Sequence, residues 1–212
     1  MTSFRPKIAE ILTPAVLQKT LAEEDFYGID LLFDREIAVG IQAKMGEFVG
    51  CRFTHCRLME SDLERTSFKD VAFEGCDLSG TRLHHASFQR VVFWECKLSG
   101  TDLVDAYLED VAFIGTNASY LSCFGARPKR LLFSECDLSY GIFSQMRVEK
   151  WRMENCNLSQ AEFLSTPLKG MDLTTCDITG IRLAGEELEG AMVTSLQAVE
   201  LSRYLGLVLQ DG

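Results

Sequence analysis

Residues 68–93 read FKDVAFEGCDLSGTRLHHASFQRVVF, with Phe or Leu at every fifth position. The same register runs from Phe48 to Val193, and every position in it is Phe, Leu, Ile, Val or Met except Ala118, Cys123 and Pro128. A step of five residues spreads side chains around an α-helix and alternates them between the two faces of a strand. One continuous interior results only if the chain turns a corner every five residues. The pattern therefore predicts a solenoid.

A second period of twenty residues indicates how many sides make one turn. Phenylalanine occupies positions 53, 73, 93, 113 and 133, while cysteine occupies 56, 76, 96, 136, 156 and 176, with Thr116 in the gap. Twenty divided by five gives four sides, so consecutive turns should pair as parallel strands about 4.8 Å apart. The residue two before each centre should also face inward, because seven of the eight cysteines lie there. We interpret these cysteines as small core residues, not as disulfides or metal ligands.

Several five-residue units share one motif: a small residue, Asp or Asn, Leu or Ile, then Ser or Thr. The clearest are Cys76-Asp77-Leu78-Ser79, Cys136-Asp137-Leu138-Ser139, Cys156-Asn157-Leu158-Ser159 and Cys176-Asp177-Ile178-Thr179. With these motifs the sequence resembles the pentapeptide repeat proteins over residues 48–193. The resemblance implies an all-β solenoid, a right-handed quadrilateral β-helix, with an N-terminal cap and a C-terminal helix.

The C-terminal sequence narrows the resemblance. Leu168-Lys169-Gly170-Met171-Asp172-Leu173 and the tail from Val193 to Leu209 are similar to the ending of the quinolone-resistance (Qnr-type) subgroup. Members of that subgroup dimerise through this tail, and they bind DNA gyrase or topoisomerase IV as mimics of duplex DNA, which protects these enzymes from quinolones. Some members carry loops between turns. The uninterrupted register here leaves no room for such insertions.

The ends of the repeat define three segments: a cap over residues 1–32, the β-helix over 33–193, and a C-terminal helix and strand over 194–212. We expect an N-terminal helix with Thr13 as its cap and Pro14 in its first turn. Thr194 and Gln197 form a capping-box pattern for the C-terminal helix, which Gly206 should end. That helix is apolar on more than one side, which favours a homodimer. The predicted interface residues are Leu196, Val199, Leu201, Tyr204, Leu205 and Leu207.

The formal net charge is −10, but residues 127–152 carry six basic and three acidic residues. Many outward positions alternate in sign at steps of twenty, for example Asp70, Arg90, Asp110 and Arg130, and such alternation is explained by pairing between turns alone. The remaining acidic residues form the predicted surface for a basic partner. They are Asp102, Asp105, Glu109, Glu162, Asp172, Glu186, Glu187 and Glu189.

No residue pattern indicates catalysis, a cofactor or a metal site, because His55, His84 and His85 belong to no constellation with a nucleophile and an acid. The chain shows no signal-peptide pattern and no membrane-length apolar stretch, so we expect a cytoplasmic protein that contacts neither membrane nor nucleic acid directly. An alternative function is a scaffold that docks a protein on an apolar outer stripe, unless the N-terminal segment covers that stripe. The stripe comprises Ala72, Val92, Ala112 and Leu132, with Trp94 and Ile114 beside it.

Overall fold

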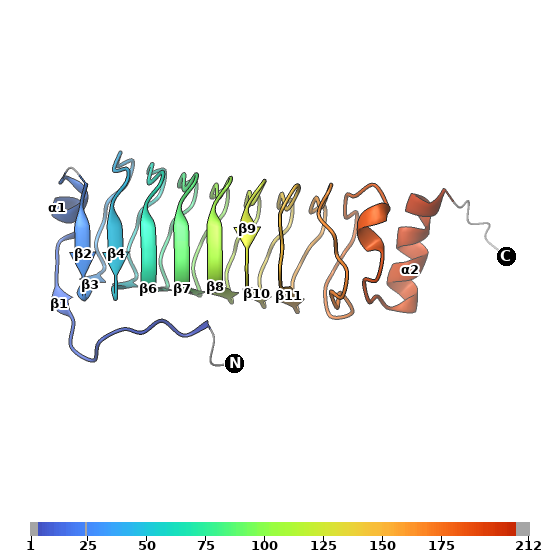
Figure 1. The fold of residues 1–212 in the computed structure, drawn as a ribbon, viewed down its shortest axis with the longest axis horizontal. Coiled ribbons are helices and arrows are strands. Elements are labelled where there is room, and N and C mark those ends of the chain that lie inside the picture. The colour runs from blue at the N-terminus through green and yellow to red at the C-terminus, as the bar shows by residue number, and fades with distance from the viewer. Residues whose placement is uncertain (1–3, 24, 207–212) are drawn as a thin grey trace.

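The computed structural model describes residues 4–23 and 25–206 of the chain. They form a parallel β-solenoid of about 7 turns, drawn out as a rod with one terminal segment at each end (Figure 1). The predicted fold class is confirmed. The sheet runs in the order β1-β3-β5-β6-β7-β8-β10-β11, with β2, β4 and β9 attached beside this path. All strand pairs in it are parallel.

The strands occupy only part of each turn. Their bounds are β1 Thr13–Pro14, β2 Tyr27–Ile29, β3 Leu31–Asp34, β4 Glu47–Val49, β5 Arg52–Thr54, β6 Ser67–Glu74, β7 Ser87–Trp94, β8 Tyr107–Ile114, β9 Arg127–Pro128, β10 Leu131–Ser134 and β11 Trp151–Glu154. The longest three, β6 to β8, continue around one corner of the turn and pair in register over both sides of it.

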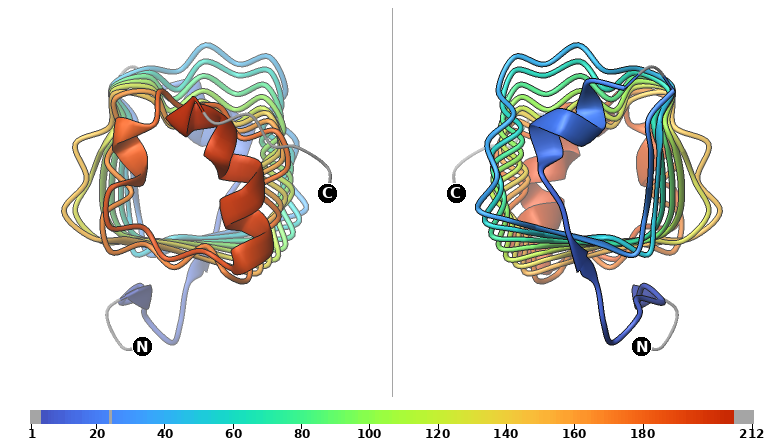
Figure 2. Two further views of the ribbon diagram at one scale, coloured as in Figure 1. Left: turned by 90° about the vertical axis from the view of Figure 1, so that its right-hand side faces the viewer. Right: turned by 90° about the vertical axis from the view of Figure 1, so that its left-hand side faces the viewer.

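Seen down its axis, the rod is four-sided (Figure 2). We name the sides by the inward residue at the centre of each, repeated at steps of twenty. Wall A runs from Phe33 to Val193, wall B from Ala38 to Ile178, wall C from Ala43 to Leu183, and wall D from Gly28 to Leu188. Walls A and D carry the strands. Walls B and C are held by single parallel bridges, such as Arg57↔Asp77 on wall B and Asp62↔Arg82 on wall C.

The corners explain the period of five. The residue two after each centre has a positive φ at nearly every corner from Asp30 to Gly190, for example 58° at Arg65 and 55° at His85. This left-handed conformation turns the chain toward the next wall. It costs a non-glycine residue roughly 1–2 kcal/mol, so the packed interior must stabilise each corner.

The interior is a column of stacked side chains. On wall A the rings of Phe73, Phe93 and Phe113 lie 4.7–4.8 Å apart and nearly parallel, and Phe53 and Phe133 extend the stack. All eight cysteines are buried free thiols, as the spacing predicted. Their small side chains leave room for the large centres beside them.

The N-terminal cap differs from the sequence prediction. Thr13 and Pro14 are not the start of a helix. They form β1, because the N–H groups of Thr13 and Ala15 donate to the carbonyls of Asp30 and Leu32 at the edge of wall A. Helix α1, Leu17–Leu21, follows, and its N-cap Val16 makes no side-chain cap. The carboxylate of Glu36 accepts the N–H of Leu17 instead. Parallel pairing of the coil already begins at β2 with Tyr27.

The C-terminal end closes with short helices. A 3-10 turn, Glu186–Leu188, precedes helix α2, Ser195–Leu201, and a second 3-10 turn, Ser202–Leu205, follows it. The predicted capping box is confirmed, with the Thr194 side chain accepting from the Gln197 N–H and the Gln197 side chain accepting from the Thr194 N–H. Gly206 has a φ of 70° and ends the helical segment, as expected. Both views in Figure 2 place α2 over the open end of the coil.

The first described residues form an N-terminal arm, residues 4–12. Figure 1 shows the arm running back along the outside of the rod from β1, beside the wall that carries the phenylalanine stack. The backbone N–H of Lys7 donates to Asp70 Oδ1 at the corner between walls D and A. The arm thus lies on the outer face of wall A.

Candidate functional site

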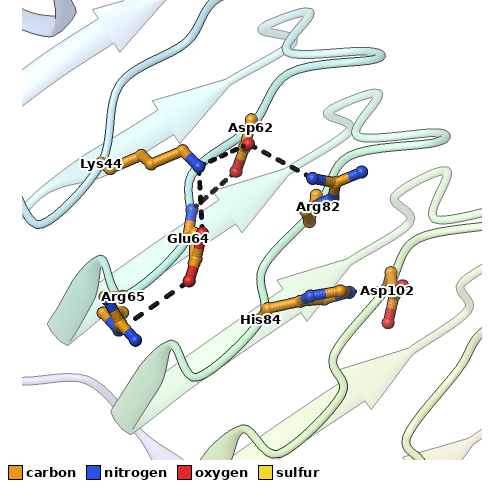
Figure 3. Close-up of polar contacts among 7 residues, drawn as sticks. All are labelled: Lys44, Asp62, Glu64, Arg65, Arg82, His84 and Asp102. Atoms are coloured by element: carbon orange, nitrogen blue, oxygen red, sulfur yellow. Dashed lines mark hydrogen bonds and ion pairs between the residues drawn. The ribbon is translucent and has the colours of Figure 1, made fainter.

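The outer face of wall C carries a network of charged residues (Figure 3). Lys44 Nζ lies 3.0 Å from both Asp62 Oδ2 and Glu64 Oε2, and Arg82 Nη1 lies 3.6 Å from the same Asp62 oxygen. These three ion pairs between turns join residues eighteen or twenty positions apart, because neighbouring turns stack in register. Hydrogen bonds from Lys44 lower the pKa of the Glu64 carboxyl. Lys44 therefore favours the ionised form of Glu64 and joins it to Asp62 in one network.

The next turns on wall C continue this pairing. His84 Nε2 lies 2.6 Å from Asp102 Oδ2, and Figure 3 shows the His84 ring directed toward that carboxylate. Arg82 belongs to the same turn as His84 and Asp62 to the preceding turn. The sequence analysis did not identify this wall C network. Opposite charges twenty residues apart, such as Lys44 and Glu64, are the sequence pattern that could have predicted it.

The corner between walls D and A holds the strongest ion pairs. Arg90 donates to Asp70 with both Nε and Nη2, at 2.6 Å each, and Arg130 makes the same fork with Asp110. These four side chains are the alternating ladder read from the sequence. Burial acts to raise the pKa of Asp70, but the hydrogen bonds from Arg90 and the Lys7 N–H outweigh it, so the pKa stays below its ordinary value.

Three of the eight predicted acidic surface residues are engaged by Lys, Arg or His side chains on neighbouring turns. Asp102 is the partner of His84. Glu109 accepts from Lys129 and Gln89, which lowers the pKa of its carboxyl, and it also contacts Arg130. Glu162 Oε2 lies 3.0 Å from Arg182 Nη2 and its other oxygen accepts from Ser144. The negative charges of Glu109 and Glu162 are therefore matched by cations within the protein.

Two more of the eight hold the backbone. Glu187 is buried and accepts the N–H groups of Ser165, Ala184 and Gly185. Burial acts to raise the pKa of Glu187, and these hydrogen bonds more than offset it, so the pKa lies below its ordinary value. Asp172 accepts the side-chain and backbone donors of Thr174, which lowers the pKa of its carboxyl. Both residues therefore have a structural role in the coil.

The last three, Asp105, Glu186 and Glu189, are exposed. Among residues 4–23 and 25–206 none of them forms an ion pair with Lys, Arg or His. Asp105 lies at a corner beside wall C near mid-rod, whereas Glu186 and Glu189 lie together near the C-terminal end. The eight predicted residues therefore do not gather on one face. The available negative charge at the C-terminal end is centred on Glu186 and Glu189.

The predicted dimer residues separate into two groups. The side chains of Leu196 and Val199 on α2 are exposed, at 84% and 55%. Leu201 is buried against the last turn, and the Tyr204 hydroxyl donates to the carbonyl of Ile181. The Leu205 side chain and all of Leu207, with the C-terminal strand expected there, lie outside the described residues. One side of α2 thus caps the coil, and the other presents apolar side chains outward.

The outer stripe of wall A is partly covered. Ala72 and Ala112 are buried, whereas Val92 and Leu132 are half-buried. Trp94 remains 50% exposed. The stripe therefore offers less continuous apolar area than the sequence suggested.

Burial also sets the properties of the core thiols. Burial raises the pKa of the Cys51 thiol to about 11, and burial likewise raises the pKa of Cys123. Within the described part of the chain, no group of three or more His, Cys, Asp or Glu side chains could hold a metal ion. No helix among the described segments is long and apolar enough to cross a membrane.

Comparisons with known proteins agree with this architecture. Residues 46–123 match the family model of the pentapeptide repeat region. HetL, a pentapeptide repeat protein involved in heterocyst differentiation regulation in the cyanobacterium Nostoc sp. strain PCC 7120, is 17% identical over 83% of this chain and 92% of its own, with a TM-score of 0.60. That likeness shows the shared fold.

A second solved structure, that of full-length QnrB1, a plasmid-mediated fluoroquinolone resistance protein, is 16% identical over 85% of this chain and 99% of its own. Its TM-score is 0.37. A search of curated proteins found no match to the sequence.

Proposed function

We propose that this pentapeptide repeat protein is a binding protein that dimerises through its C-terminal end and occupies the DNA-binding groove of a type II topoisomerase, DNA gyrase or topoisomerase IV. Bound there, it would act as a DNA mimic and protect the enzyme from quinolones. The proposal rests on the resemblance of the C-terminal sequence to the Qnr-type subgroup and on the properties of the rod's end.

The single observation that carries the dimer is the outward face of α2. Leu196 and Val199 are exposed there, and Met192 beside the helix is 50% exposed. Single exposed apolar residues are common on protein surfaces, but three on one short terminal segment favour an interface. A two-fold axis at this end would join two rods into one longer rod.

Charge supports the choice of partner. The chain has a net charge of −10 and a sequence pI of about 4.8, so a groove lined with Lys and Arg attracts it. Glu186 and Glu189 lie close to the proposed two-fold axis, and a dimer would bring two copies of this pair near its centre.

Two measurements test the proposal in order. Light scattering of the full chain should give a dimer, and Leu196→Asp with Val199→Asp should give a monomer with an unchanged circular dichroism spectrum. Ile11→Asp is the matched control, because Ile11 is equally exposed on the N-terminal arm. A monomeric parent chain would overturn the dimer.

A gyrase supercoiling assay with a quinolone then tests the target. The parent chain should protect supercoiling at stoichiometric excess, and Glu186→Lys with Glu189→Lys should weaken protection. Glu60→Lys, an exposed carboxylate at a distant corner, is the control. An absence of any effect on gyrase and on topoisomerase IV would remove the target.

The alternative function is a scaffold that docks a protein on the stripe of wall A. The half-buried Leu132 and exposed Trp94 favour it, while the burial of Ala72 and Ala112 reduces its area. A pull-down with the Leu132→Asp variant and one with the Glu186→Lys variant separate the two functions. Loss of the bound protein with only the Leu132→Asp variant would support the scaffold.

A further inference from the structure

Near the C-terminal end, two consecutive turns of the coil lack backbone hydrogen bonds to each other on two adjacent walls. Strand β11 pairs with β10 on one side. On the other side no bridge and no backbone hydrogen bond joins it to residues 171–174, all of which the structure describes. The same two turns remain joined on walls B and C, through the bridges Asn157↔Asp177 and Glu162↔Arg182. We call the opening between residues 147–155 and 167–175, on walls D and A, the seam.

The sequence around the seam explains the missing pairing on wall D. In the preceding turns the residue before the wall D centre donates its N–H to the turn before it, from Tyr107 to Ala86, and from Arg127 and Arg147 to the equivalent carbonyls. The next residue in that series is Pro167, which has no N–H to donate. The carbonyl of Met146 therefore loses its ladder donor.

Wall A opens for two further reasons. The Thr174 N–H, which would pair with the turn before it, donates to the Asp172 carboxylate at 2.9 Å. Trp151 occupies the inward slot that holds Val91, Val111 and Leu131 in earlier turns, and its ring reaches across the interior to lie 5.9 Å from the Phe163 ring. A side chain of this size displaces the next turn.

The corners flanking the seam are irregular too. Arg130, Lys150 and Thr175 are the corner positions between Asp30 and Gly190, all within the described range, that lack a positive φ. Two of these three border the opening. The departure from regular geometry is therefore local to this part of the rod.

The seam exposes a strand edge. In the preceding turn the Leu131 N–H donates forward to the Lys150 carbonyl. The N–H groups of Trp151 and Met153 point the same way in the next turn and find no acceptor among the described residues. The following donor, Asn155 N–H, binds the Thr175 hydroxyl at 3.0 Å, which closes the seam at that end. An exposed edge of this kind is a template for an added strand.

Two cavities of about 480 and 530 Å³ lie along the seam and share Trp151, Arg152 and Gly170. The first is also lined by Phe4 of the N-terminal arm and by Arg130, Lys150 and Lys169, with Glu149 as its one acidic residue. The second is also lined by Glu154 and Asp172. In the described part of the chain neither Lys150 nor Lys169 forms an ion pair. Positive charge is thus available in the first cavity, in a protein that is strongly acidic as a whole.

We propose that the seam binds an extended acidic peptide segment of a partner protein. The peptide backbone pairs with the free edge of Trp151 and Met153, a carboxylate contacts Lys150 and Lys169, and an apolar side chain packs on Trp151. This site lies on the side of the rod. It adjoins the acidic residues of the proposed function, because Lys169 also lines a cavity with Glu186 and Glu189.

Tryptophan fluorescence tests the proposal directly. The chain has two tryptophans, so Trp94→Phe leaves Trp151 as the single reporter within the seam. A short capped peptide of alternating valine and glutamate should give a saturable change in that emission. Lys150→Glu with Lys169→Glu in the same background should weaken binding about tenfold or more, because two charge-assisted contacts are lost. Arg57→Glu with Lys97→Glu, two exposed cations on wall B, is the control.

Three further results decide the binding mode. The matching valine–lysine peptide should not bind, and equal binding would overturn the role of charge. Methylation of alternate peptide nitrogens should abolish binding, since it removes the peptide N–H groups that would donate to the backbone carbonyls of the exposed strand edge. Pro167→Ala with Asp172→Ala restores a donor to the Met146 carbonyl on wall D and frees the Thr174 N–H on wall A, so this double variant should close the seam. It should bind the peptide more weakly than the parent, with an unchanged melting temperature or a higher one. Retained affinity in that variant, or no saturable change with the parent, would refute the proposal.

Discussion

The turns through β6, β7 and β8 and the turns on either side of the seam carry the same five-residue register but pair differently. Between Ser67 and Ile114 neighbouring strands pair in register on both walls D and A. Between residues 147 and 175 the apolar centres continue, yet these two walls lose their ladder. The apolar pattern thus directs the chain around the coil. Closure of each turn on the next depends separately on available backbone donors and on left-handed corners.

The largest expected change in stability is in the regularly paired turns, at the phenylalanine stack of wall A. Phe93 stacks between Phe73 and Phe113 and is almost fully buried. Phe93→Ala should lower the free energy of unfolding by about 3–5 kcal/mol, because it leaves a cavity in a stack that cannot collapse. Urea unfolding followed by circular dichroism measures it. Trp94→Ala on the outer face of the same strand should change it little, and a similar loss in both variants would contradict the role of the stack.

A smaller effect is expected at the corner that joins walls D and A. Asp70→Asn removes the carboxylate that binds Arg90 and the arm, and should cost about 1.5–3 kcal/mol at neutral pH. The folded pKa of Asp70 lies below its ordinary value of 3.8, so this stability is present above that value and is lost as pH falls through the folded pKa.

Unfolding measured from neutral to acidic pH should therefore show the parent and the Asp70→Asn variant converging as the pH falls below about 3.8. Asp105→Asn, at an exposed corner, serves as the control. A constant difference at every pH would mean that Asp70 acts through packing, not through its charge.

Hydrogen exchange compares the two regions residue by residue. The amides of Trp151 and Met153 should exchange roughly tenfold or more faster than those of Leu131 and Phe133, their equivalents one turn earlier. Only the earlier pair donates to a following turn. Nuclear magnetic resonance of the full chain resolves these amides, and equal protection of both pairs would show that the seam is closed in solution.

The smallest effect is expected on wall C. Arg82 is exposed and lies 3.6 Å from Asp62, so Arg82→Ala should change the free energy of unfolding by less than about 1 kcal/mol. Added salt should reduce even that difference. A loss comparable with Asp70→Asn would show that the wall C network is cooperative.

Much of the regular part of the fold could be predicted from the sequence. The register of five and the ladder of twenty predicted the four walls, the phenylalanine stack and the pairing of Asp70 with Arg90, because neighbours twenty residues apart are set by the repeat. The capping box at Thr194 was equally local. The helix start predicted at Thr13 was wrong because a non-local strand pairing with Leu31 took precedence over the capping propensity of that sequence.

The acidic surface was harder to predict from the sequence. The contacts of Asp102 with His84, of Glu162 with Ser144 and of Glu187 with Ser165 span eighteen or twenty-two residues, so they depend on how side chains cross between turns. Pro167 and Trp151 were visible in the sequence, but their effect appears only when the neighbouring turn is in place.

The sequence by itself determined that this chain coils with four sides around a core of large centres and small partners, because a period of five admits one continuous interior only in that form. Tertiary structure alone decided which carboxylates remain available, which side of α2 faces outward and where the ladder opens. These features depend on contacts between segments that do not repeat, and no local pattern encodes the geometry in which such segments meet.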